Sequence, residues 1–208
     1  MKVQSSFFVS IGMTLFLASA SFAQPVNPDG TASLPQADDF VPMTGRERAA
    51  HYAHSIFGPE AFLFSAASAG IGQLDDSPHE WGQGAEGFGR RFGSAYAHRI
   101  VGQTIENGLA WGLHEDNRYF LSGKKGTGRL GYAITSAFLA RHDDGSRFIS
   151  ISGFSGAAGG AFISRAWQPS STSSMGDGAR SFGISMGARV GLNVAREFLP
   201  RRIGKFLQ

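Results

Sequence analysis

Apolar residues recur every three or four positions along most of this chain, the spacing that places them on one face of a helix. Runs that alternate apolar and polar β-branched residues, the mark of a half-buried strand, are scarce. The pattern therefore predicts an all-α fold, a compact bundle of about six helices. The expected helices span residues 45–57, 59–74, 81 or 86 to 113, 128–141, 147–167 and 175–199.

Three local signals define the ends of these helices. Thr44 and Glu47 have the capping-box spacing, in which a hydroxyl and a carboxylate satisfy backbone amides that the first turn leaves unpaired. Pro59 suits the first turn of the second helix, because an amide hydrogen would lack a partner there anyway. Pro200 ends the last helix. We expect ordered structure to begin at Thr44.

The chain contains 29 glycines, each of which disfavours a helix by about 1 kcal/mol relative to alanine. Many of them recur four residues apart with alanine and serine, and such a row forms a groove that a neighbouring helix can approach closely. We expect the helices to pack through these rows, so that leucine at Gly187 or Gly191 would destabilise the fold. The rows are Ala66 and Gly70; Ala85, Gly89, Gly93 and Ala97; Ser152, Gly156, Gly160 and Ser164; and Gly183, Gly187, Gly191 and Ala195.

The N-terminus has the features of a secretory signal peptide over residues 1–23. An apolar run from Phe7 to Leu17 is followed by Ser21 and Ala23, which predicts cleavage before Gln24. Residues 24–43 are rich in proline and predict a flexible linker, and residues 44–208 a single helical domain. The chain has no cysteine, hence no disulfide and no site for lipid attachment. We expect export to the periplasm or cell envelope.

Charge is distributed unevenly along the chain, whose formal net charge is +3. Residues 24–117 contain 5 basic and 12 acidic residues, whereas residues 118–208 contain 13 basic and 4 acidic residues. Either the two halves face each other, or the basic half faces an anionic envelope surface such as lipid headgroups. Self-association through the helices is the other interaction that the pattern suggests. Nucleic acid is not an expected partner, because the arginines are scattered rather than clustered with aromatic residues.

Several short motifs resemble catalytic or nucleotide-binding sequences but lack the required context. Gly82, Gly84 and Gly87 have the G-x-G-x-x-G spacing, yet no strand precedes them, so packing explains them better than a phosphate loop. Ser185 lies in a G-x-S-x-G sequence, but no histidine follows it as a nucleophile elbow requires. We therefore expect no nucleotide and no cofactor.

Two polar loops contain the residue types of a metal or acid–base site. In an up-and-down bundle both would lie at the same end, which would support a small metal-dependent or acid–base hydrolase. The alternative, which the abundance of such loops favours, is that they are solvated turns in which aspartate caps the next helix. The residues are Asp75, Asp76, His79 and Glu80 before the third helix, and His142, Asp143 and Asp144 between the fourth and fifth.

A second polar segment follows the third helix and combines charged with aromatic side chains. Arg118 could pair with either Glu115 or Asp116, while Tyr119 and Phe120 attach the segment to the bundle. This mixture is typical of a structural clamp and is the second choice for a functional surface. The residues of that surface are His114, Glu115, Asp116, Arg118 and Tyr119.

Four segments resemble a family of uncharacterised exported bacterial proteins, over about residues 66–200. They read DDSPHEWGQGAEGFGRRFGSAYA at 75–97, LHEDNRYF at 113–120, GRLGYA at 128–133 and REFLP at 196–200. The resemblance implies export but no activity and no catalytic residues.

Two classes of function remain open. The first, which we favour, is a non-enzymatic envelope protein that acts through its surface, through membrane association or through assembly. An uncharged span of 17 residues, 148–164, is at the lower limit for crossing a bilayer and is expected to be a buried core helix. The second is the hydrolase described above.

Overall fold

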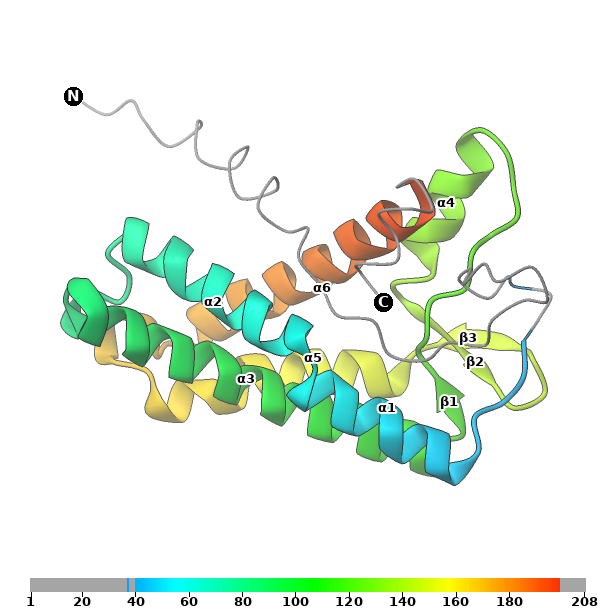
Figure 1. Cartoon of the computed structure of the whole chain (residues 1–208), viewed down its shortest axis with the longest axis horizontal. Helices are drawn as coiled ribbons and strands as arrows, with labels where there is room; N and C mark the ends of the chain where they lie inside the picture. Colours follow the sequence, from blue (N-terminus) through cyan, green and yellow to red (C-terminus); the bar gives the residue numbers. More distant parts are fainter. Residues whose placement is uncertain (1–36, 38–39, 199–208) are drawn as a thin grey trace.

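A computed structural model describes residue 37 and residues 40–198 of the chain (Figure 1). Helix α1 spans Gly45–Phe57 and α2 spans Pro59–Leu74. The capping box at the start of α1 is confirmed, because Thr44 accepts from the Glu47 amide while Glu47 accepts from the Thr44 amide at 2.8 Å. The predicted signal peptide and most of the predicted linker lie outside the described residues.

The centre of the fold is a close crossing between α3, Gly84–Gly112, and α5, Ile151–Ile163. A Cβ atom built on Gly156 would lie 2.7 Å from the carbonyl oxygen of Gly102, and one on Gly160 would lie 3.1 Å from that of His98. The two backbones are therefore in contact, and the small-residue row of α5 is buried against α3. The rows of α2 and α3 do not behave in this way, because Gly70, Gly89 and Gly93 have nothing within 4 Å of an added Cβ.

The glycines before α3 form a turn rather than a phosphate loop. Gly82 and Gly84 adopt φ values of 65° and 79°, a region that favours glycine. Gly87 lies so close to this turn that an added Cβ would be 2.2 Å from the carbonyl oxygen of Gly82. Close packing thus explains Gly87, whereas Gly82 and Gly84 are explained by the backbone conformation of the turn, because nothing lies within 4 Å of a Cβ added at either.

A three-stranded antiparallel sheet corrects the purely helical expectation. It consists of β1 (Glu115–Asp116), β2 (Leu139–His142) and β3 (Arg147–Ile149) in the order β1-β2-β3. The helix expected over 128–141 ends early, since α4 spans Thr127–Thr135, and the one expected from 147 begins only at Ile151. The reason is the turn between β2 and β3, where Gly145 adopts a φ of 80° and Asp144 accepts from the Ser146 amide.

Helix α6, Met175–Phe198, does not pack against the core through the expected glycine row. Gly183, Gly187 and Gly191 are exposed and have nothing within 4 Å of an added Cβ. The buried side contains Met186 and the polar residues Asn193 and Glu197. The row Arg189, Asn193 and Glu197, spaced four residues apart, faces inward because charged groups of other helices contact it, as when Arg189 pairs with Glu106 at 2.5 Å. Leucine at Gly187 or Gly191 is therefore not expected to overpack the fold.

In the described residues, several polar side chains are fully buried while several large apolar side chains are exposed. The largest side chains below 2 % exposure are polar: Glu115, Asp116, Ser150, Ser152 and Ser164. Large apolar side chains lie outside, and Leu74, Phe57 and Ile149 are 77 %, 71 % and 65 % exposed. The all-α expectation thus holds in its coarse form only, as a mostly helical chain with a small sheet. Over residues 40–198, no helix has both the length and the apolar character needed to traverse a bilayer.

Candidate functional site

The two loops that were expected to converge lie at opposite ends of α3. Residues 75–80 precede the N-terminus of α3, whereas His142 pairs in the sheet with Glu115, which follows its C-terminus. A helix of 29 residues is about 44 Å long, and Figure 1 places the α2–α3 connection and the sheet at the two ends of the molecule. The expectation of a shared site is wrong because α3 runs the full length of the fold. A hydrolase that uses both loops therefore lacks its site.

The loop of residues 75–80 is held in place by hydrogen bonds to residues of neighbouring segments. Asp76 accepts a hydrogen bond from the Gln83 amide group at 2.7 Å, and Asp75 is the C-terminal cap of α2. Glu80 accepts from the Ser171 hydroxyl at 2.7 Å, which lowers the pKa of Glu80, while His79 is 70 % exposed. Within the described part of the chain, no group of three or more histidines and carboxylates is placed to hold a metal ion.

The second loop meets the surface that begins at His114. The Nδ1 atom of His114 lies 2.7 Å from Oδ2 of Asp143, and Arg48 reaches the other oxygen of this carboxylate at 3.3 Å. Asp144 stabilises the hairpin turn, where the Ser146 hydroxyl lowers the pKa of Asp144. The structure therefore joins His142, Asp143 and Asp144 to the second candidate surface rather than to the first loop.

Glu115 is 1 % exposed, and its buried side chain caps the N-terminus of α5. Its carboxylate accepts from the backbone amides of Ile151 at 3.1 Å and Ser152 at 2.9 Å, and from the Ser152 hydroxyl. These are first-turn amides without helical partners, and a negative charge at a helix N-terminus is favourable. Arg48 donates to the Glu115 carbonyl at 2.7 Å. Glu115 is thus a structural residue.

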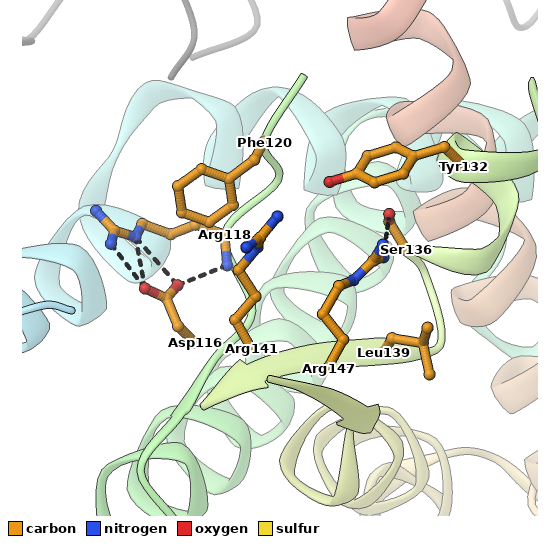
Figure 2. Close-up of a pocket in the computed structure, with 8 residues that line it drawn as sticks. All are labelled: Asp116, Arg118, Phe120, Tyr132, Ser136, Leu139, Arg141 and Arg147. Carbon is orange, nitrogen blue, oxygen red and sulfur yellow. Dashed lines mark hydrogen bonds and ion pairs between the residues drawn. The ribbon is translucent and has the colours of Figure 1, made fainter. Parts of the chain in front are cut away.

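A row of charges crosses one face of the sheet. Asp116 of β1 is the register partner of Arg141 in β2, and Arg141 is the register partner of Arg147 in β3. Arg118 approaches from beyond β1 and pairs with Asp116, donating from Nε at 3.0 Å and from Nη2 at 2.7 Å. Of the two partners that the sequence allowed for Arg118, the structure selects Asp116. Figure 2 shows this pair beside Arg141 and Arg147.

Aromatic rings contact the guanidinium groups of Arg141 and Arg147. The guanidinium carbon of Arg141 lies 5.3 Å from the ring centre of Phe40 and 5.2 Å from that of Phe120. That of Arg147 lies 4.6 Å from the ring centre of Tyr132, and Arg147 also donates to the Ser136 hydroxyl at 2.7 Å. Cation–π contacts of this kind fix a guanidinium without using its N–H donors.

The arginines line a small hollow with surplus positive charge. Its cavity volume is about 10 Å³, roughly the space that one water molecule needs. Three arginines and one aspartate line it, which leaves a net charge of +2, and Asp116 is already paired with Arg118. Among the described residues, neither Arg141 nor Arg147 has an ion-pair partner. Such a surface attracts an anion. We refer to Asp116, Arg118, Arg141 and Arg147 as the arginine row.

Tyr119 connects this surface to α6 through a buried carboxylate. Its hydroxyl donates to Glu197 at 2.6 Å, and Ser122 and Arg129 also bind Glu197. Burial raises the pKa of Tyr119, and the hydrogen bond to Glu197 raises it further. Burial alone would raise the pKa of Glu197, but the hydrogen bonds from Ser122, Tyr119 and Arg129 outweigh it and lower this pKa.

Replacing Glu197 by glutamine is expected to destabilise the protein in a pH-dependent way. Because the folded-state pKa of Glu197 is lowered, its contribution is present above the unfolded-state value of about 4.3 and is lost as the pH falls through the folded-state pKa. Urea denaturation should therefore give a clear deficit for Glu197→Gln at pH 7 that shrinks toward pH 3. An equal deficit at both values would show that the charge of Glu197 does not matter.

The sequence interpretation placed Asp116 and Arg118 on a functional surface but did not identify Arg141 and Arg147. Both were assigned to helices, on either side of a loop, where nothing indicates a common face. One signal was available: Asp144-Gly145 is a dipeptide typical of hairpin turns, and it separates two short apolar segments. Recognising it would have paired the two strands and brought the arginines together.

No family model, curated protein or solved structure matches this chain. The resemblance to exported bacterial proteins therefore stays a prediction from the sequence segments.

Proposed function

We propose that this protein is a non-enzymatic, exported component of the cell envelope that binds peripherally to an anionic membrane surface through the end that contains the sheet. The observation that carries this proposal is the arginine row beside uncovered apolar side chains. Export itself rests on the predicted signal peptide, and the proposal needs no cofactor and no nucleotide.

The apolar part of this surface comes from β3 and the start of α5. Ile149 and Ile151 are 65 % and 56 % exposed, and Phe148 is 63 % exposed. Side chains alternate along a strand, so Ile149 lies on the same face of the sheet as Arg147, whereas Phe148 lies on the other face, where its ring contacts His142. A bilayer interface accommodates both features, since apolar side chains enter the acyl boundary while guanidinium groups attract anionic headgroups.

Serine at Ile149 is expected to weaken binding to vesicles of phosphatidylglycerol and phosphatidylcholine by about tenfold or more. Fully burying one such side chain contributes about 1.5–3 kcal/mol, and about 1.4 kcal/mol corresponds to a factor of ten. Vesicle flotation would measure the effect, with circular dichroism to confirm folding. Binding should also fall with added salt and on vesicles of phosphatidylcholine alone.

A matched control is the Ile71→Ser, Leu74→Ser variant. These side chains are 53 % and 77 % exposed but lie near the opposite end of α3, so vesicle binding should be unchanged. Equal losses in the Ile149→Ser variant and in this control would contradict docking through the sheet. If the chain instead forms a dimer that does not bind vesicles, and Ile149→Ser abolishes the dimer, self-association replaces the proposal.

A further inference from the structure

The structure assigns a binding site for a phosphate group to Arg141 and Arg147, with Arg118 at its margin. The oxygens of the phosphate would enter the hollow of the arginine row while the rest of the ligand stays outside. This inference deepens the proposed function by naming the headgroup chemistry, but its chemistry stands even for a soluble phosphate ester.

The register of the sheet places two positive charges directly opposite each other. Arg141 and Arg147 are direct partners across β2 and β3. Like charges directly opposite each other destabilise an antiparallel pair, by an amount similar to what an opposite-charge pair contributes. Asp116 lies on the other side of Arg141. Its carboxylate does not neutralise the charge of the second arginine, because it already accepts hydrogen bonds from Nε and Nη2 of Arg118. An anion between the two guanidinium groups removes this repulsion.

The guanidinium groups of Arg141 and Arg147 are held in place by other contacts that use few of their N–H donors in the described part of the chain. Within the described residues, the guanidinium of Arg141 makes contacts to ring faces and no hydrogen bond, and that of Arg147 makes one, to Ser136. Each guanidinium carries five N–H donors. Both groups are thus oriented by Phe40, Phe120 and Tyr132, and most of their in-plane donors have no acceptor among the described residues, which leaves them available to an oxyanion.

The size and the charge of the hollow also fit a phosphate group. A cavity of about 10 Å³ excludes a sugar, a base or an acyl chain, so only terminal oxygens can enter. The net charge of +2 matches a phosphate monoester, and guanidinium groups bind phosphate oxygens in a bidentate manner. The exposed Ile149 on the same face would then contact whatever apolar group the phosphate carries.

Inorganic phosphate tests the site directly. The melting temperature of the purified chain should rise and saturate as phosphate replaces chloride at constant ionic strength, because a ligand of the folded state stabilises it. The Arg141→Gln, Arg147→Gln variant should lose this rise, with phosphate affinity in calorimetry reduced at least about tenfold. The matched control Arg90→Gln, Arg180→Gln removes two exposed arginines and should respond like the natural chain.

A second variant covers the case in which the glutamine variant does not fold. Arg141→Lys, Arg147→Lys keeps both charges but loses the planar fork, so it should retain attraction to anionic vesicles and bind phosphate more weakly. The inference is overturned if the natural chain shows no saturable rise, or if either variant responds as strongly as the natural chain.

Vesicles of phosphatidic acid in phosphatidylcholine identify the source of the phosphate. Competition between inorganic phosphate and these vesicles supports a lipid headgroup. A phosphate response without vesicle binding supports a soluble phosphate ester and overturns the proposed function alone. Vesicle binding that persists undiminished in a glutamine variant that has lost the phosphate response overturns the lipid headgroup as the source, removes the arginine row from membrane binding, and supports a soluble phosphate ester.

Asp38 and Asp39, which precede Phe40, lie outside the described residues and are tested separately. The Asp38→Asn, Asp39→Asn chain should give the same phosphate response as the natural chain. A response that appears only in this variant would mean that the chain's own carboxylates occupy the site, and would overturn the inference.

Discussion

Replacing Arg91 by methionine is expected to lower the free energy of unfolding by about 3 kcal/mol or more. Arg91 is 3 % exposed and donates to the carbonyl groups of Ser77, Pro78 and Gly82 at 3.0, 2.9 and 2.6 Å, and to the side chain of Gln73 at 2.8 Å. Methionine fills a similar volume but donates no hydrogen bond, so these acceptors lose their partner. Urea denaturation monitored by circular dichroism would measure the change.

The adjacent residue supplies the control. Arg90 is 53 % exposed and pairs with Glu86 one helical turn away at 2.6 Å. An exposed pair of this kind contributes only about 0.3–0.5 kcal/mol, so Arg90→Met should stay close to the natural chain. Similar losses for the two variants would mean that Arg91 does not organise the connection between α2 and α3.

Alanine at Gly156 is expected to destabilise the fold by about 2 kcal/mol or more, in the range of overpacked cores. The new Cβ would lie 2.6 Å from the Cβ of Glu106 and 2.7 Å from the carbonyl oxygen of Gly102. One of these contacts is backbone, so α3 and α5 must move apart. The clash must also outweigh the gain in helix propensity of about 1 kcal/mol that alanine brings. Thermal and urea unfolding would measure the net effect.

The same substitution at Gly187 should raise the stability of the fold rather than lower it. Nothing lies within 4 Å of a Cβ added there, so only the gain in helix propensity remains, and Gly187→Ala should stabilise the protein by up to about 1 kcal/mol. Destabilisation of both variants would mean that α6 packs through its glycine row, as the sequence pattern suggested.

Local features of the fold could be predicted from neighbouring residues. The bounds of α1 and α2 follow from Thr44, Glu47 and Pro59, because capping hydrogen bonds and the missing amide of proline act within one helical turn. The segment around β1 could also be identified as polar and clamp-like. The partner of Arg118 could not, since Glu115 and Asp116 both lie within its reach along the chain.

The choice between those two carboxylates depends on long-range contacts. Successive residues of a strand point to opposite faces, so Glu115 turns toward the N-terminus of α5 while Asp116 turns toward β2 and Arg118. Which carboxylate caps a helix is decided by where α5 lies, and α5 is about 35 residues further on. No pattern within the segment contains that information.

The sequence by itself determined the mostly helical class, the ends of the first helices and the accumulation of basic residues after residue 118, because these depend on composition and on contacts between near neighbours. Only the tertiary structure decided which row of α6 faces the core, how far apart the two polar loops lie, and that Arg141 and Arg147 stand opposite each other. A glycine row and a polar row are equally compatible with a helix, and the groups that α6 meets across the bundle select between them. Likewise, the register of β2 and β3 depends on the turn at Gly145, and that register turns scattered arginines into one charged surface.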